Sequence, residues 1–108
     1  QVEAVRVLHE LGANIDIPDN NGWTPVLVAA GNGQVEVVRV LHQLGANIEA
    51  PDKDGTTPVN CAAQNGCVEA ARVLHELGAN VETPDKNGWT PVCFAAERGH
   101  MEVVRVLH

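Results

Sequence analysis

The 108-residue sequence is poor in aromatic residues, because Trp23, Trp89 and Phe94 are the only ones that it contains. Its apolar residues make up 44% of the chain and are mainly Val, Leu and Ala. This share is enough to build the core of one domain. A core of small aliphatic side chains requires many thin layers that pack closely, so we expect a layered fold.

Basic residues are also scarce: seven Lys and Arg stand against fourteen Asp and Glu, for a formal net charge of −7. Nucleic acids and anionic membrane surfaces both attract proteins through clustered Lys and Arg. We therefore expect neither a nucleic-acid nor a membrane partner. No run of residues approaches the ~18 consecutive apolar residues of a membrane-spanning helix.

Cysteine is rare and is not arranged as a disulfide framework. Cys61, Cys67 and Cys93 form an odd set without a Cys-x-x-Cys pair, which is typical of reduced thiols and indicates an intracellular, cytoplasmic protein. We expect Cys61 and Cys93 to be small packing residues inside helices. Cys67 and His100 occupy equivalent positions in adjacent units, but a nucleophile also needs an orienting group and an oxyanion site.

Other signs of catalysis are lacking too. The sequence contains no glycine-rich phosphate loop, no paired acid set and no Ser-His-Asp arrangement. We expect no enzymatic activity and no cofactor.

What the sequence does contain is a repeat of 33 residues. The segment Leu-Gly-Ala-Asn has its glycine at Gly12, Gly45 and Gly78. Thr-Pro recurs with the same step at positions 24, 57 and 90, and Pro-Asp recurs at positions 18, 51 and 84. Self-similarity at such a period is typical of solenoid proteins, in which each unit packs only on its neighbours.

Each unit encodes two helices and a loop. Thr24-Pro25 predicts the start of a short helix, because Thr caps free amides and Pro suits the first turn. Apolar residues at three- and four-residue spacing from Val35 to Leu44 predict a second helix, which Gly45 ends. The remainder, rich in Pro, Asp, Asn and Gly, predicts an extended hairpin loop. The expected first helices span 25–30, 58–64 and 91–97, and the expected second helices span 2–11, 35–44, 68–77 and 101–107.

This order of elements at a period of 33 resembles the ankyrin repeat family over essentially the whole chain. The resemblance is carried by Gly-Trp-Thr-Pro at 22–25, Ala-Ala at 29–30, Gly33 and Leu-Gly-Ala-Asn-Ile at 44–48, with counterparts in the later units. It implies an all-α solenoid of stacked helix-turn-helix repeats with β-hairpin loops. We expect one domain, with a partial repeat at 1–18, full repeats at 19–51 and 52–84, and a partial repeat at 85–108.

The sequence departs from the family pattern in ways that matter for stability. The family usually follows Thr-Pro with Leu-His, whose imidazole ties neighbouring units together, whereas this chain has Val-Leu, Val-Asn and Val-Cys. We therefore expect that hydrogen-bond network to be lost. The usual Gly-Ala-Asp-Val-Asn becomes Gly-Ala-Asn-Ile-Glu, which moves the acid along the hairpin.

The resemblance also implies a function, which is protein–protein recognition through the concave face formed by hairpin tips and first helices. Trp23 and Trp89 lie at the tips, with Thr56 between them, and exposed Trp is a frequent interface anchor. The alternative is that each indole packs along the neighbouring hairpin and stiffens it. By position, the candidate partner-binding residues are Asn20, Asn21, Trp23, Asn32, Lys53, Asp54, Thr56, Gln64, Asn65, Lys86, Asn87, Trp89, Glu97 and Arg98.

Two further patterns have structural interpretations. The histidines at 9, 42, 75 and 108 stand one layer apart, roughly 8–10 Å, whereas ligands of one zinc ion lie about 2.0–2.1 Å from it. We expect no metal site, and each His suits the carboxyl end of its helix. Glu and Arg three residues apart, at 3/6, 36/39, 69/72 and 102/105, are expected to form pairs on a solvated helix face.

The two ends of the chain leave other roles open. Both repeat the apolar pattern of the interior, whereas the end units of a solenoid need polar caps. We therefore expect a fragment of a longer ankyrin repeat array, or a protein that associates with itself through its uncapped ends. The function that competes with partner binding is that of a structural spacer segment within such an array.

Overall fold

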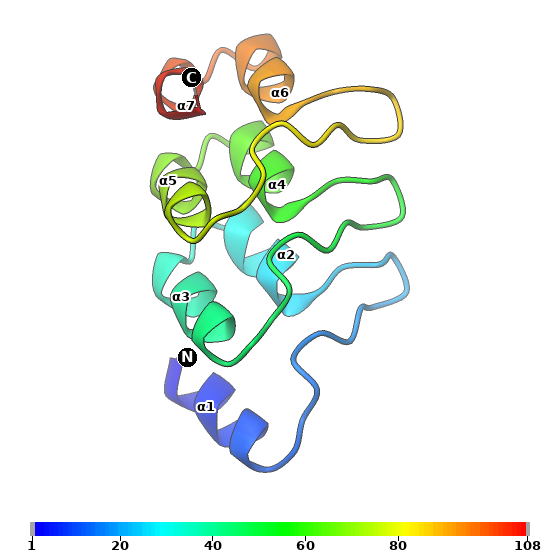
Figure 1. Cartoon of the computed structure of the whole chain (residues 1–108), viewed down its shortest axis with the longest axis vertical. Helices are drawn as coiled ribbons and strands as arrows, with labels where there is room; N and C mark the ends of the chain where they lie inside the picture. Colours follow the sequence, from blue (N-terminus) through cyan, green and yellow to red (C-terminus); the bar gives the residue numbers. More distant parts are fainter. Residues whose placement is uncertain (1, 108) are drawn as a thin grey trace.

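Helices stacked in two columns make up the fold (Figure 1). The computed structural model describes residues 2–107, and none of these residues lies in a strand. One column contains the second helices of the units, the other contains the first helices, and the loops project to one side. The predicted all-α solenoid is therefore confirmed. The helices are α1 (Val2–Glu10), α2 (Pro25–Gly31), α3 (Val35–Gln43), α4 (Pro58–Gln64), α5 (Val68–Glu76), α6 (Pro91–Glu97) and α7 (Met101–Leu107).

We call the pairs α2–α3, α4–α5 and α6–α7 layers 1, 2 and 3. Helix α1 lies beyond layer 1 and packs on α3. Among the described helices, it is the one second helix without a first helix beside it (Figure 1).

The first helices begin as the sequence predicts. The Thr24 hydroxyl accepts a hydrogen bond from the Leu27 amide at 3.3 Å, and Pro25 occupies the first turn. Thr57 and Thr90 cap α4 and α6 in the same way. These caps satisfy an amide that the helix itself leaves free, so each first helix has a fixed starting residue.

Three of the second helices, α1, α3 and α5, end one residue earlier than expected, whereas α7 has the expected bounds. Leu44 closes α3 as its cap residue, and Gly45 follows with φ +95°. The Gly45 amide donates to the His42 carbonyl, and the Ala46 amide donates to the Leu41 carbonyl. This is the Schellman arrangement, in which a left-handed glycine satisfies the last carbonyls of a helix. The predicted role of Gly45 is confirmed, and α2 extends one residue further than predicted, to Gly31.

Small side chains hold the layers together. Ala30 and Ala63 are completely buried between successive first helices, while Leu41 and Leu74 fill the space between the two columns. Because alanine has no atoms beyond Cβ, neighbouring helix backbones can approach closely. The core is thus a series of thin aliphatic layers, as the composition predicts.

Polar contacts also join the layers, and one of them lies at a position where the histidine network of the family was expected to be lost. Asn60 is completely buried at the position of the family histidine, and its side-chain amide donates to the Thr83 carbonyl at 3.3 Å. The shifted acid has a role as well. The Glu49 carboxylate accepts a hydrogen bond from the backbone N–H of Asn80 at 3.0 Å. The Asp16 carboxylate accepts one from the backbone N–H of Asn47 at 3.1 Å.

We predict that Gly45→Ala lowers the free energy of unfolding by about 1–2 kcal/mol, because a Cβ disfavours the left-handed backbone. No described atom lies within 4 Å of that Cβ, so the loss is conformational. Gly45→Asn should lose less, since Asn tolerates this region. Gly22→Ala should lose more, because its Cβ would also lie 2.9 Å from the Lys53 nitrogen. Urea unfolding measures all three, and an unchanged midpoint for Gly45→Ala would contradict the argument.

Candidate protein-binding face

The fourteen candidate residues lie on the hairpin tips and at or just beyond the carboxyl ends of the first helices. The hairpin loops project to one side of the stack, next to the column of first helices (Figure 1). Thr56 and Gln64 are half-buried, and the other twelve are exposed. The structure thus makes most of this set accessible to a partner.

Each tip is held by an aspartate, a role that was not among the predicted ones. The Asp19 carboxylate accepts hydrogen bonds from the Asn21 and Trp23 amides, both at 2.9 Å, and the Asp19 amide donates to the Trp23 carbonyl. Asp52 and Asp85 hold their tips in the same way. The recurrence of Pro-Asp every 33 residues was the available signal, because Asp bonds the backbone of tight turns.

Backbone hydrogen bonds link successive tips. The Lys53 amide donates to the Asn21 carbonyl at 3.4 Å, and the Lys86 amide donates to the Asp54 carbonyl at 3.0 Å. The side chains of these four residues remain exposed. The backbones of successive tips are therefore fixed relative to one another. Their side chains remain free to make other contacts.

The two tryptophans have different surroundings. Trp23 is 39% exposed and lines a surface cavity of about 630 Å³ together with Val28 and Asn32. Trp89 is 37% exposed and packs on Phe94, with ring centroids 5.4 Å apart and planes tilted by 42°. Phe94 lies in α6, the helix that follows this tip, so the Trp89 indole packs on its own layer and not along the neighbouring hairpin, while the residue remains partly accessible to a partner.

The charge of the face is mixed. Its cations are Lys53, Lys86 and Arg98, and its acids are Asp54 and Glu97. Arg98 and Glu97 pair at 3.3 Å, which neutralises the edge of the third layer. The net charge of −7 therefore lies on other surfaces, and this face is not adapted to a strongly charged ligand.

Among the candidates, Asn65 also stabilises the stacking of the layers. The Asn65 side-chain amide donates to the Gly31 carbonyl at 2.8 Å, across the boundary between layers 1 and 2. Asn65 remains exposed, although its side-chain amide already donates this hydrogen bond. Its substitution would change the stack as well as the face.

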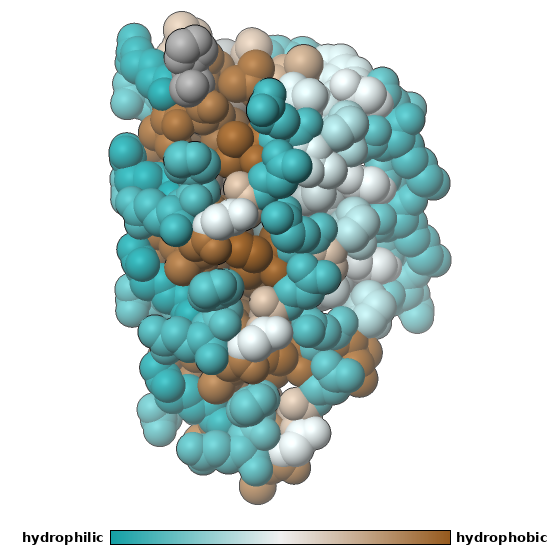
Figure 2. All heavy atoms as spheres, viewed as in Figure 1, coloured by the Kyte–Doolittle hydropathy of each residue, from teal (hydrophilic) through white to brown (hydrophobic). Residues whose placement is uncertain are grey.

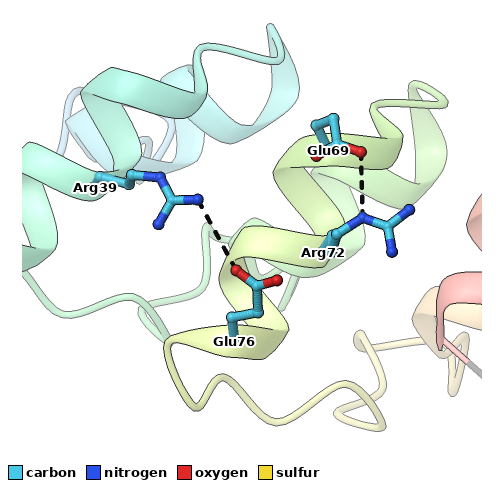
Figure 3. A network of polar contacts seen from close by, with 4 residues as sticks. All are labelled: Arg39, Glu69, Arg72 and Glu76. Carbon is cyan, nitrogen blue, oxygen red and sulfur yellow. Dashed lines mark hydrogen bonds and ion pairs between the residues drawn. The ribbon is translucent and has the colours of Figure 1, made fainter.

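The second helices carry the Glu and Arg residues on the opposite side. Arg72 pairs with Glu69 at 3.2 Å, as expected from their spacing (Figure 3). Arg39 instead reaches Glu76 of α5, at 3.9 Å (Figure 3). In the outer helices, Arg105 pairs with Glu102, whereas Arg6 donates to Gln43 of α3. These side chains are exposed, so each pair contributes only about 0.2–1 kcal/mol.

Of the histidines that recur every 33 residues, His9, His42 and His75 are exposed, and His108 lies outside the described residues. Across residues 2–107, no group of three or more His, Cys, Asp or Glu side chains is arranged to hold a metal ion. Cys67 and His100 each contact a carbonyl of the preceding layer. The Cys67 thiol lies 3.5 Å from the Gly31 oxygen, and His100 Nε2 lies 3.2 Å from the Gln64 oxygen.

The cysteines divide by their burial. Cys61 is buried as predicted, and burial raises the pKa of its thiol to about 12. Cys93 is exposed, which contradicts its expected packing role. The equivalent residues Leu27 and Asn60 are buried under the following layer, and no described layer follows α6. A hydrogen bond from the Thr90 hydroxyl, at 3.2 Å, lowers the pKa of the Cys93 thiol.

Family models match the whole of this stack. A model described as ankyrin repeats, in three copies, matches residues 1–85, and a model described as ankyrin repeat matches residues 87–108. No curated protein matches the sequence. None of the helices within residues 2–107 is long and apolar enough to cross a bilayer.

We predict that iodoacetamide modifies Cys93 first and Cys61 only on unfolding. The thiolate is the reacting form, so a lowered pKa moves the rise of the Cys93 rate to a lower pH, whereas the raised pKa of Cys61 moves its rise upward. Thr90→Ala should shift the Cys93 profile to higher pH, and Thr90→Ser, which keeps the hydroxyl, should not. Peptide mass spectrometry over a pH series measures this, and modification of Cys61 ahead of Cys93 would contradict it.

Proposed function

Because the chain belongs to the ankyrin repeat family, we propose that it binds another protein through the face formed by its hairpin tips and first helices. Ankyrin repeats are generally protein–protein interaction modules and are typically not enzymes. The proposal for this chain concerns the binding face and the residues that make contact.

The main support for the proposal is a contrast between the positions that fix the backbone and the exposed side chains that the backbone carries. The supporting positions repeat from layer to layer: Thr caps, buried alanines and the tip aspartates. Several positions of the face differ between layers, as Trp23 differs from Thr56 and Asn32 differs from Arg98. A fixed backbone with varied exposed side chains lowers the entropy lost on binding and leaves specificity to the side chains.

The tryptophans are the best anchors on this face. Indoles are enriched among the residues that dominate binding energy, and the backbone at each tryptophan is held by a hydrogen bond to the tip aspartate. The Trp89 indole also packs on Phe94, so it loses less rotamer freedom on binding than an unsupported indole would. The mixed charges around them favour a partner with an apolar contact surface and a polar rim.

Three free cysteines also support an intracellular location as part of this proposal. Exposed Cys93 in particular would be oxidised or paired outside a reducing compartment.

We predict that Trp23→Ala/Trp89→Ala loses about 2 kcal/mol or more of binding free energy, roughly a thirtyfold weaker complex. Affinity capture from lysate with the parent chain identifies the partner, and titration calorimetry with the purified partner then measures the loss. The matched control is Glu36→Ala/Glu69→Ala, on the opposite face, which should bind like the parent. Circular dichroism checks that each variant is folded.

Equal affinity of parent and tryptophan variant would remove the tips as the binding face. Loss of binding in the Glu36→Ala/Glu69→Ala control alone would move the site to the second helices. Capture of no partner by the folded parent would favour a structural spacer.

A further inference from the structure

The second helices α1, α3 and α5 each continue into the stem of a hairpin, and the stems follow one another along the stack. The segments after α3 and α5 pass in front of the helices in Figure 1. The Asp16 carboxylate joins the first stem to the second, and the Glu49 carboxylate joins the second to the third. We call the continuous surface of these helix ends and stems the stem face, which consists of residues 9–17, 42–50 and 75–83.

Leucine recurs along the stem face at positions 11, 44 and 77, one layer apart. Leu44 and Leu77 are the cap residues of α3 and α5, and both are partly exposed. Leu44 has a described stem on each side, so its exposure does not result from a missing neighbour. In Figure 2, which views this side of the molecule, apolar side chains form a column with hydrophilic ones beside it. The leucine row is therefore an apolar surface of the stack itself.

The charge around the leucine row has one sign. The stem face contains five of the fourteen Asp and Glu residues of the chain and none of its seven Lys and Arg residues. The rest of the chain, with nine acids and seven bases, is nearly balanced. Most of the net charge of −7 therefore lies beside the leucines, on Glu10, Asp16, Glu49, Glu76 and Glu82.

The backbone adds to this negative potential. Helices α1, α3 and α5 end at the stem face, and the carboxyl end of a helix carries partial negative charge. Among residues 2–107, one cation pairs with an acid of this face: Arg39 Nη2 lies 3.9 Å from Glu76 Oε1. Glu49 and Glu82 are exposed and have no such cation beside them.

We propose that the stem face binds a basic segment of a partner protein, in which Lys or Arg side chains alternate with apolar ones. Lys and Arg suit this face, because their methylene groups lie along apolar surface while their charged ends stay in water. The charged ends would meet the carboxylates, and the apolar side chains between them would contact Leu44 and Leu77. The phosphates of nucleic acids and anionic lipids would instead be repelled. Charge complementarity therefore selects a basic protein segment.

The stem face shares no residue with the fourteen candidates of the protein-binding face, whose charge is mixed. The chain would thus have two recognition surfaces of different chemistry, one with indoles and one with leucines and carboxylates. Binding at the stem face does not depend on Trp23 or Trp89, so either site can fail without the other.

The first test titrates the isotope-labelled chain with a short peptide of alternating Lys and Leu, followed by NMR. The amide signals of residues 42–50 and 75–83 should shift most. A peptide of alternating Lys and Ser, with the same charge, should bind about tenfold more weakly or less, because it lacks the apolar contacts. Largest shifts at the hairpin tips, or equal affinity of the two peptides, would overturn the proposal.

Two pairs of substitutions separate the stem face from the net charge. Glu49→Gln/Glu82→Gln removes two acids of the face, and the new amide at position 49 keeps an oxygen that can accept from the Asn80 backbone. It should raise the Kd of the Lys-Leu peptide about tenfold. Glu36→Gln/Glu69→Gln makes the same change of net charge on the opposite face and should raise it about twofold at most. Equal losses in both pairs would show that the net charge alone attracts the peptide, which contradicts a specific site.

Leu44→Ser tests the leucine row. Leu44 does not belong to the buried core cluster, so the variant should fold, and circular dichroism checks this. It should weaken the Lys-Leu peptide severalfold and leave the Lys-Ser peptide unchanged. Unchanged binding of the Lys-Leu peptide would remove the leucines from the site. Trp23→Ala/Trp89→Ala should bind both peptides like the parent, and a loss there would place the peptide on the candidate protein-binding face instead.

Discussion

Close stacking of the first helices is the constraint on which the rest of this structure depends. Ala30 and Ala63 leave no exposed surface between helices, so successive backbones lie near enough for side chains of one layer to reach carbonyls of the layer before. The Asn65 amide reaches the Gly31 carbonyl at 2.8 Å in this way. The same spacing brings the hairpins together, and the Lys86 amide bonds the Asp54 carbonyl. A larger residue in place of either alanine would separate both the helices and the tips, since overpacked cores respond by backbone shifts.

A stack built only from contacts between neighbours gives every layer two stacking surfaces of interior composition. Which of them is buried depends on what lies next to it. Cys61 and Val28 occupy the same position on their helices. Cys61 is buried against the preceding first helix α2, whereas no described first helix precedes α2 and Val28 is 41% exposed. The apolar ends and the closely packed interior thus have the same cause.

This dependence on neighbours also separates what the sequence could predict from what it could not. Helix starts, the Gly45 turn and the all-α stack follow from local signals repeated three times, and all are confirmed. The exposure of Cys93 was predicted wrongly, because burial at that position comes from the following layer and not from the helix itself. Arg39 pairs with Glu76 because long exposed side chains choose among partners of nearly equal energy, which spacing along one helix does not reveal.

The candidate face was predictable in a more limited sense. Hairpin position predicts exposure, and twelve of the fourteen residues are exposed. Their use by a partner, like the division of the chain into two full and two partial repeats, stays a prediction. The structure adds that Trp23 belongs to two surfaces, the candidate face and the cavity beside α2. A partner bound to the candidate face through Trp23 would therefore also border this cavity, so substitutions at Val28 or Asn32 would be felt by such a partner.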